Sequence, residues 1–346
     1  MLTTTLEPLA AWTTLRLGGP ARTFVEAPGR AKLFEAVESA DARQEPVLVL
    51  GGGSNLVVAD EGFEGTVVRV TSGGVAAHVH SNASAEVTVE AGESWERLVA
   101  LAVQENWVGI EALAGIPGTV GAVPIQNVGA YGQEVAQSIA LVEVHDRLER
   151  RLRAMTPAEC GFGYRTSVFK QVPDRSVGGA VTFRFQRGAL GAPITYPELA
   201  RQLGVDTGKR VPISDVRSAV LTLRTAKGMV LDPDDHDTWS AGSFFTNPLL
   251  QPAEVPPGAP AFPAPDGRVK TSAAWLIEQA GFTKGYGNDR VSLSTKHTLA
   301  LTNRGRASTR DLLALAAEIR DGVRARFGIT LQPEPVCVNC SLDNPG

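Results

Sequence analysis

The glycine-rich segment 115–132, with the sequence GIPGTVGAVPIQNVGAYG, most constrains what this chain can fold into. Glycine adopts positive φ angles and lets the backbone approach a ligand closely. Successive free N–H groups in such turns form a concavity suited to phosphate. A flexible linker would be rich in Gly and Ser, but here apolar residues separate the glycines, namely Ile116, Val120, Val123, Ile125 and Val128. We therefore expect an ordered, packed loop with a ligand against its backbone.

A second glycine cluster lies upstream. Residues 46–50, PVLVL, predict a short buried strand, and Gly51, Gly52, Gly53, Ser54 and Asn55 follow directly. A strand that ends in a glycine cluster can present its backbone to a phosphate. The three glycines are consecutive and no GxGxxG follows, so the fingerprint of a doubly wound dinucleotide fold is absent. Two such loops in one chain fit the two ends of a large dinucleotide better than one loop does.

Composition limits the classes of function. The chain has 346 residues, of which 43% are hydrophobic and 20% charged, as in a globular protein with two or three domains. A net charge of −4 argues against nucleic-acid binding. The sequence contains no run of ~18 apolar residues that would predict a membrane span. The first residues lack the basic region and apolar core of a signal peptide. We therefore expect a cytoplasmic protein that binds neither nucleic acid nor membrane.

The three cysteines, Cys160, Cys337 and Cys340, are too few for a disulfide scaffold. Cys337 and Cys340 form a single CxxC pair. A structural zinc site needs about four ligands, and the five histidines show no matching spacing. We therefore predict no metal site and interpret these residues as incidental thiols.

Hydrophobic periodicity predicts alternating helices and strands. The helices are expected at residues 30–40, 95–105, 212–227, 273–280 and 309–327. The strands are expected at 46–50, 66–70, 86–91, 180–186 and 298–302, in a hairpin at 139–155 and in the C-terminal tail. Ser214 and Ser308 are the expected N-caps of the third and fifth helices, and Gly328 is expected to end the fifth.

Eight blocks of sequence carry a resemblance to a known family. They are TLRLGGPA (14–21), VLGGGSNL (49–56), AGIPGTVGAVPIQNVGAYG (114–132), ECGFGYRTSVFK (159–170), ITYPEL (194–199), AGSFFTNP (241–248), VKTSAAWLIEQAG (269–281) and LQPEP (331–335). On these blocks the chain resembles the UDP-N-acetylenolpyruvoylglucosamine reductases nearly from end to end. The block ITYPEL is similar to the longer of the family's two types.

The resemblance implies an α+β fold. Its FAD-binding domain is of the vanillyl-alcohol-oxidase (PCMH) type and has two lobes, expected at 1–72 and 73–228. A third, substrate-binding α+β domain is expected at 229–328, and residues 329–346 would return to the active site as a strand. The implied reaction is the NADPH-dependent reduction of an enolpyruvyl UDP-sugar by a protein expected to be a monomer. Neither glycine loop contains His or Cys, so we expect the FAD to be held non-covalently.

The resemblance also implies roles for individual residues. Arg165 would bind the substrate carboxylate, Ser243 would donate the proton, and Glu334 would stabilise the intermediate. Tyr164, Tyr196, Asn247 and Lys270 are the candidates for substrate binding. The expected cofactor contacts are Gly51, Gly52, Gly53, Ser54, Asn55, Gly115, Ile116, Pro117, Gly118, Thr119, Gly121, Ala122, Asn127, Gly129 and Ala130.

One position departs from the family pattern. In relatives of the longer type, the loop before AGSFF carries a lysine that helps to hold nucleotide phosphates, whereas this chain has Asp234 and Asp235 there. Lys227 or Lys270 are alternative cations. Two other functions stay open at this point: a different flavin oxidase or dehydrogenase of the same fold, and a nucleotide-binding module without catalysis.

Overall fold

The computed structural model describes residues 3–81, 83–264 and 266–343, and the chain divides into two compact units. The first unit consists mainly of Arg22–Gly52 and Glu64–Ala226. The second consists of Glu7–Ala21, Gly53–Phe63 and the residues from Lys227 onward. The division into lobes and domains expected from the resemblance is finer than these two units and stays a prediction.

The first unit contains two sheets. The smaller sheet has the strand order β1-β2-β5-β3, in which β3 and β5 are parallel. Its strands are β1 (Thr3–Pro8), β2 (Pro20–Ala27), β5 (Phe63–Val70) and β3 (Val47–Leu50). Helix α1 (Arg30–Ala42) buries Leu33 and Val37 in a core shared with Val68. The first glycine cluster therefore begins where the buried strand β3 ends.

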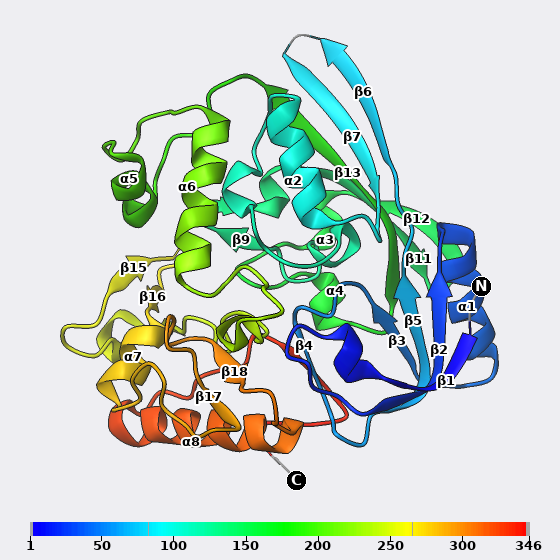
Figure 1. Cartoon of the computed structure of the whole chain (residues 1–346). Helices are drawn as coiled ribbons and strands as arrows, with labels where there is room; N and C mark the ends of the chain where they lie inside the picture. The colour runs from blue at the N-terminus through cyan, green and yellow to red at the C-terminus, as the bar shows by residue number, and fades with distance from the viewer. Residues whose placement is uncertain (1–2, 82, 265, 344–346) are drawn as a thin grey trace. The chain divides into compact units, whose positions relative to one another are not determined.

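The larger sheet of this unit has the order β12-β11-β13-β7-β6, and β8 also pairs with β13. In Figure 1 the long strands β6, β7 and β13 run side by side, with α2 and α6 next to them. The strands are β6 (Val75–Ser81), β7 (Ser84–Glu90), β8 (Trp107–Val108), β11 (Ile139–Asp146), β12 (Arg151–Met155) and β13 (Ser176–Arg187). Helix α2 (Trp95–Gln104) begins at Ser94, whose hydroxyl accepts a hydrogen bond from the Arg97 N–H. Trp95, Phe183 and Phe185 are fully buried, so the core lies between this sheet and the helix.

Shorter elements complete the first unit. They are α3 (Pro157–Cys160), α4 (Val168–Gln171), α5 (Pro197–Leu203), α6 (Ile213–Ala226), and the two-stranded pair β9 (Gly129–Ala130) and β10 (Gln133–Glu134). The glycine-rich segment contributes β9, so this part of the segment is ordered by strand pairing.

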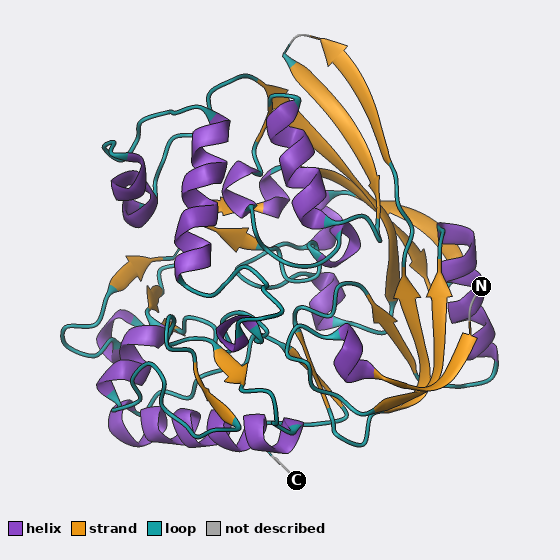
Figure 2. Ribbon diagram, in the orientation of Figure 1, coloured by secondary structure: helices purple, strands orange, loops and turns teal. Residues whose placement is uncertain are grey.

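The second unit is built around helix α8 (Thr309–Phe327). Ser308 and Asp311 form a capping box at its start, and Gly328 ends it with φ 71°, so both predictions are confirmed. Figure 2 shows that the rest of this unit consists of short strands joined by long loops around α7 and α8. These elements are β4 (Leu56–Val58), β14 (Leu249–Leu250), β15 (Ala261–Pro263), β16 (Val269–Thr271), α7 (Ala273–Gln279), β17 (Val291–Leu293), β18 (Leu301–Asn303) and β19 (Val336–Val338).

The five predicted helices are confirmed, with ends that shift by at most a few residues. The prediction of Ser214 as an N-cap is wrong, because α6 already begins at Ile213 and the Ser214 hydroxyl contacts Asp215 at 3.2 Å. The expected strand at 298–302 is also shorter, since β18 begins only at Leu301. Strand β6 was not predicted, because its residues 75–79 are exposed and carry no apolar periodicity. Among the helices of the described residues, none has the length and apolar character needed to cross a membrane.

Candidate functional site

The two glycine loops meet in the first unit. A Cβ atom added to Gly52 would lie 2.7 Å from the Gly118 Cα atom, and one added to Gly51 would lie 2.5 Å from the Thr119 hydroxyl oxygen. Gly118 has φ 131°, a conformation that side chains with a Cβ rarely adopt. Glycine is therefore required here so that the two backbones can approach each other. The two loops therefore pack directly against each other at these positions, and their placement at the two ends of a dinucleotide stays a prediction.

The second loop rests on the large sheet and on α2. The Gly121 N–H donates to the Ala91 carbonyl at 2.8 Å, and the Gly115 N–H donates to the Glu96 carboxylate at 2.5 Å. The Ala122 N–H closes a turn on Thr119 at 3.0 Å. These three N–H groups are therefore used inside the protein. They are not available to donate to a phosphate, whereas the carbonyl groups of the same residues can still accept hydrogen bonds.

Tyr164 and Arg165 form the tip of a tight turn. Gly163 and Thr166 flank them as an antiparallel bridge, with N–H to carbonyl distances of 3.0 and 3.4 Å. Arg165 has φ 53°, and its guanidinium carbon lies 5.6 Å from the centre of the Tyr164 ring. The turn therefore presents a phenol and a guanidinium together, stacked as a cation–π pair.

Three hydrogen bonds attach this turn to the glycine-rich segment. They are Ser167 hydroxyl to Ile125 carbonyl (2.6 Å), Asn127 amide to Gly163 carbonyl (3.1 Å) and Arg165 guanidinium to Gly129 carbonyl (2.7 Å). Two motifs that are separate in the sequence, PIQNVGAYG and CGFGYRTS, are thus one structural assembly. The guanidinium of Arg165 is held in place by the same loop that was predicted to bind the cofactor.

Asn127 is the centre of this assembly. It is buried and has φ 45°. Its amide nitrogen also donates to the Glu134 carboxylate at 2.9 Å, and its amide oxygen accepts from the Ala136 N–H at 3.1 Å. Both ends of the amide therefore bind protein groups. The side chain of this predicted cofactor residue orders the loop.

Tyr131 is a residue that the sequence reasoning missed. Its ring packs edge-on against Tyr196 with 5.4 Å between ring centres, and a Cβ at the neighbouring Gly132 would lie 2.4 Å from the Thr195 hydroxyl. Burial raises the pKa of Tyr131 to about 12, and burial also raises the pKa of Tyr196. Both phenols therefore stay protonated at neutral pH and can donate hydrogen bonds. The position of Tyr131 within the glycine-rich segment, between Ala130 and Gly132, was the sequence signal that could have identified it as a site residue.

In the second unit the structure brings together Ser243 and Glu334. The Glu334 N–H donates to the carbonyl of Phe244 at 2.8 Å, and Phe245 forms an antiparallel bridge with Pro333. Phe244 and Phe245 are each only 1% exposed, whereas Ser243 is half-buried. The two predicted catalytic residues thus lie on adjacent, hydrogen-bonded segments. The two residues that follow Ser243 are aromatic and buried away from solvent.

The first glycine loop continues into this unit through Asn55. Its carbonyl accepts from the Val336 N–H at 2.9 Å, and its amide nitrogen lies 3.4 Å from the Glu334 carbonyl. A Cβ at Gly53 would collide with the Trp12 carbonyl at 1.9 Å, and Gly53 has φ 60°. Asn55 therefore supports the segment that carries Glu334.

Asn247 and Lys270 lie near the start of helix α7. The Asn247 amide oxygen accepts from the Ala273 N–H at 2.9 Å, so this amide is oriented by the helix N-terminus. Lys270 pairs with Leu249 in the small sheet formed by β14 and β16. The structure fixes the backbone of both residues on neighbouring segments.

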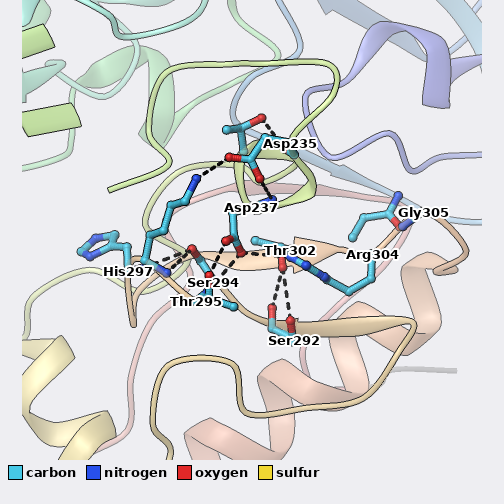
Figure 3. Close-up of polar contacts among 12 residues, drawn as sticks. Asp235, Asp237, Ser292, Ser294, Thr295, His297, Thr302, Arg304 and Gly305 are labelled. Carbon is cyan, nitrogen blue, oxygen red and sulfur yellow. Dashed lines mark hydrogen bonds and ion pairs between the residues drawn. The ribbon is translucent and has the colours of Figure 1, made fainter. Parts of the chain in front are cut away.

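The acidic loop before Ser243 is held by a polar cluster (Figure 3). Lys296 pairs with Asp235 at 2.5 Å. The buried Asp237 accepts from the Thr295 N–H at 3.0 Å and from Arg304 at 2.9 Å. Burial opposes ionisation of Asp237, but the bonds from Thr295 and Arg304 outweigh burial and lower its pKa. Lys296 and Arg304 are therefore the cations paired with this loop, and neither was among the alternatives expected from the sequence.

The predicted site residues are divided between the two units. Those of the first unit are Gly51, Gly52, Gly115, Ile116, Pro117, Gly118, Thr119, Gly121, Ala122, Asn127, Gly129, Ala130, Tyr164, Arg165 and Tyr196. Those of the second unit are Gly53, Ser54, Asn55, Ser243, Asn247, Lys270 and Glu334. The structure assembles Arg165 with the glycine loops in the first unit and Ser243 with Glu334 in the second.

Comparison with known proteins gives two family matches. Residues 21–149 match the model described as "FAD binding domain", and residues 232–338 match "UDP-N-acetylenolpyruvoylglucosamine reductase, C-terminal domain". The matches agree with the α+β fold and with the predicted FAD-binding domain. Both glycine loops lie within the region that matches this FAD-binding domain.

Curated relatives match along nearly the whole chain. The UDP-N-acetylenolpyruvoylglucosamine reductases of Cutibacterium acnes and Thermobifida fusca are each 55% identical over 97% of this chain, covering 90% and 98% of those proteins. A solved reductase of the same name from Thermus caldophilus is 25% identical, with a TM-score of 0.64 over 97% of this chain and 98% of that one.

Proposed function

Because the chain belongs to the UDP-N-acetylenolpyruvoylglucosamine reductase family, we propose that it reduces UDP-N-acetylglucosamine enolpyruvate to UDP-N-acetylmuramate with NADPH. This step would serve peptidoglycan precursor synthesis in the cytoplasm, and the enzyme would act as a monomer. The observation that carries the proposal is the assembly of the Tyr164–Arg165 turn with the glycine-rich segment. A flavin site alone has no need of an arginine fixed in this way.

The reaction assigns three tasks to the protein: to hold the substrate carboxylate, to stabilise negative charge that develops next to it, and to supply one proton. FAD, when bound, supplies the hydride chemistry. The glycine loops would hold FAD around Gly51, Gly52, Gly118 and Thr119, where the two loops pack against each other.

Arg165 is proposed to bind the carboxylate. Its planar guanidinium pairs with two oxygens at once and stays charged at any working pH. The hydrogen bond to Gly129 and the stacking on Tyr164 support this role, because they restrict the plane of the fork before substrate arrives. Restricting a side chain in advance lowers the entropic cost of binding.

Ser243 is proposed to give the proton, and Glu334 to stabilise the charge that develops. A hydroxyl is neutral and protonated at pH 7, so it can act as a general acid without bringing a charge of its own. The fully buried Phe244 and Phe245 support the assignment, because a dry wall on one side limits the directions from which a proton arrives. The hydrogen bond from the Glu334 N–H to the Phe244 carbonyl joins the segment of Glu334 to the segment of Ser243.

Tyr164, Tyr196, Asn247 and Lys270 are proposed to bind the sugar and diphosphate. The raised pKa of Tyr196 supports a role as hydrogen-bond donor. Since the Asn247 amide oxygen already accepts from Ala273, its contact with substrate would come from the amide nitrogen.

Two half-reactions test the proposal. Anaerobic NADPH should bleach the flavin band of the purified protein, and the enolpyruvyl UDP-sugar should then restore it with formation of UDP-N-acetylmuramate. Bleaching by NADPH without restoration by this substrate would make the protein a different flavin oxidoreductase. A protein purified without flavin and unable to take up FAD would contradict catalysis altogether.

A further inference from the structure

Cys337 and Cys340 are brought together at the end of strand β19. Cys337 pairs with Val57 in the parallel ladder between β19 and β4, and the Cys340 thiol donates to the carbonyl of the same Val57 at 3.3 Å. Asn339 lies between them in the sequence and has φ 54°, so the chain turns here. The Asn339 side-chain amide donates to the Gly62 carbonyl at 2.9 Å, which fixes this turn. Both cysteines are therefore held beside Val57, on the two sides of this turn.

The environment makes the two thiols unequal. When Cys337 loses its proton, the Cys340 S–H can turn from Val57 to the thiolate, and this hydrogen bond lowers the pKa of Cys337 although burial opposes the shift. The same hydrogen bond and burial raise the pKa of Cys340. Thiolates are the reactive form of cysteine. Cys337 therefore has the character of an attacking thiolate and Cys340 that of its protonated partner.

The third cysteine provides an internal comparison. Cys160 is fully buried in the first unit, and burial raises its pKa to about 12. Cys337 and Cys340 are instead only partly buried at the edge of the core of the second unit. Within the part of the chain that the structure describes, no group of three or more His, Cys, Asp or Glu could hold a metal ion. Two partly buried cysteines held beside one residue, Val57, are suited to thiol–disulfide chemistry.

We propose that Cys337 and Cys340 form a peroxide-sensitive dithiol that closes reversibly into a disulfide. The Cys337 thiolate attacks the peroxide O–O bond and becomes a sulfenic acid, and hydroxide leaves. The sulfur of Cys340 then attacks the sulfenic sulfur. The S–S bond forms, and the sulfenic oxygen leaves as water with the proton from Cys340. In total the two thiols lose two electrons and two protons, and hydrogen peroxide is reduced to water.

The disulfide would alter the strand that follows Glu334. Its formation removes the S–H group that Cys340 donates to Val57, so the end of the β4–β19 ladder loses one hydrogen bond. Val336, at the other end of β19, is bonded to Asn55. The redox change would therefore occur in the same C-terminal segment that carries Glu334. This inference concerns the thiols alone and does not depend on the proposed reaction.

Mass spectrometry of the folded full-length protein tests the proposal. The reduced protein is treated with hydrogen peroxide, denatured and alkylated. We expect an intramolecular Cys337–Cys340 link with loss of two hydrogen atoms, alkylation of Cys160 alone, and recovery of all three thiols after dithiothreitol. Three thiols that remain alkylatable, a disulfide between two chains, or direct conversion to sulfonic acid would each overturn it.

Single substitutions separate the roles of the two thiols. C337S should slow peroxide consumption at least ~10-fold, because the reactive thiolate is lost. C340S should react at the wild-type rate but stop at the sulfenic acid, which a dimedone probe traps. C160A should behave like the wild type. Equal rates for C337S and wild type would overturn the assignment of Cys337. If a variant does not fold, the wild-type mass measurement still decides whether the disulfide forms.

Discussion

The guanidinium of Arg165 donates a hydrogen bond to the carbonyl oxygen of Gly129 at 2.7 Å, and these residues belong to two motifs that are separate in the sequence. The same guanidinium limits what can stand at Gly129, because a Cβ there would lie 3.2 Å from an Arg165 Nη atom. The arginine and the glycine are thus mutually dependent. Position 129 needs glycine for the space that Arg165 and β10 occupy.

Arg165→Lys should impair the step that consumes the substrate. Lysine keeps the positive charge but loses both the planar fork and the stacking on Tyr164. We expect at least a ~10-fold slower reoxidation of the reduced enzyme by substrate, equivalent to about 1.4 kcal/mol. Stopped-flow absorbance measures this step separately from reduction by NADPH.

Arg184→Lys is the matched control, since the Arg184 side chain is 71% exposed and forms an ion pair with Glu86. It should behave as the wild type. A wild-type rate for Arg165→Lys in the same assay would remove the bidentate role of Arg165.

Gly129→Ala should reduce the FAD content of the purified protein and slow the substrate-dependent step. The added methyl group would lie 2.9 Å from both the Gln133 carbonyl oxygen and the Glu134 Cγ, so β9 must move away from β10. Overpacking of this kind costs about 1–3 kcal/mol. The ratio of flavin to protein absorbance measures the occupancy.

Gly188→Ala is the control for this change, because the nearest atom to a Cβ there is a Val108 methyl at 3.9 Å. It should keep its full FAD content. Equal FAD content in the two variants would mean that position 129 does not support the cofactor loop.

Much of the fold could be predicted because its helices are regular. The capping box at Ser308 and the stripe of α8 are local signals, and both occur as expected. Such local signals could not predict contacts between segments that are far apart in the sequence. The bond from Asn127 to Gly163 spans 36 residues, and nothing in a single sequence reports it. The same holds for Lys296, which reaches Asp235 from 61 residues away.

The site residues were predicted from the family resemblance, and the structure shows the hydrogen bonds that position them. Asn127 was predicted as a cofactor contact from its place in the glycine motif, where side chains are few. In the structure its amide fixes the turn of Arg165, and the cofactor contact stays a prediction. A polar residue in an otherwise apolar loop can serve either purpose, and only its partners distinguish the two.

Asp237→Asn should destabilise the second unit. The Asp237 side chain is 7% exposed and is paired with Arg304 at 2.9 Å, so the amide leaves a partly buried cation without its counter-charge. We expect a loss of roughly 1–3 kcal/mol in the free energy of unfolding at pH 7. Urea denaturation followed by circular dichroism measures it.

The loss should depend on pH in a defined direction. The folded-state pKa of Asp237 is lowered, so its contribution is present above the unfolded-state value of about 3.9 and disappears as pH falls through the folded-state pKa. The difference between variant and wild type should therefore be constant near neutrality and shrink below pH ~4. Asp266→Asn, at an exposed pair with Arg268, should show no measurable difference at any of these pH values. A pH-independent difference for Asp237→Asn would mean that its charge is not the cause.

Ser243→Ala should block the substrate half-reaction and leave reduction by NADPH nearly normal. Reduction of the flavin by NADPH needs no proton from this hydroxyl, whereas the substrate carbon must receive one. General acid catalysis contributes typically ~10²–10⁴-fold, so reoxidation by the enolpyruvyl substrate should slow by that order. Stopped-flow absorbance at the flavin band measures the two half-reactions on the same sample.

Ser243→Cys distinguishes a proton donor from a structural hydroxyl. Ser243 lies between Gly242, with φ 74°, and the buried Phe244, so a turn hydroxyl that serves only the local backbone is the competing explanation. A thiol can still give a proton but is a weak hydrogen-bond donor. We therefore expect Ser243→Cys to keep part of the activity in the substrate half-reaction, with unchanged thermal stability for both variants. If alanine and cysteine slowed both half-reactions equally, Ser243 would be structural, and Glu334, on the adjacent segment, would be the next candidate for the proton donor.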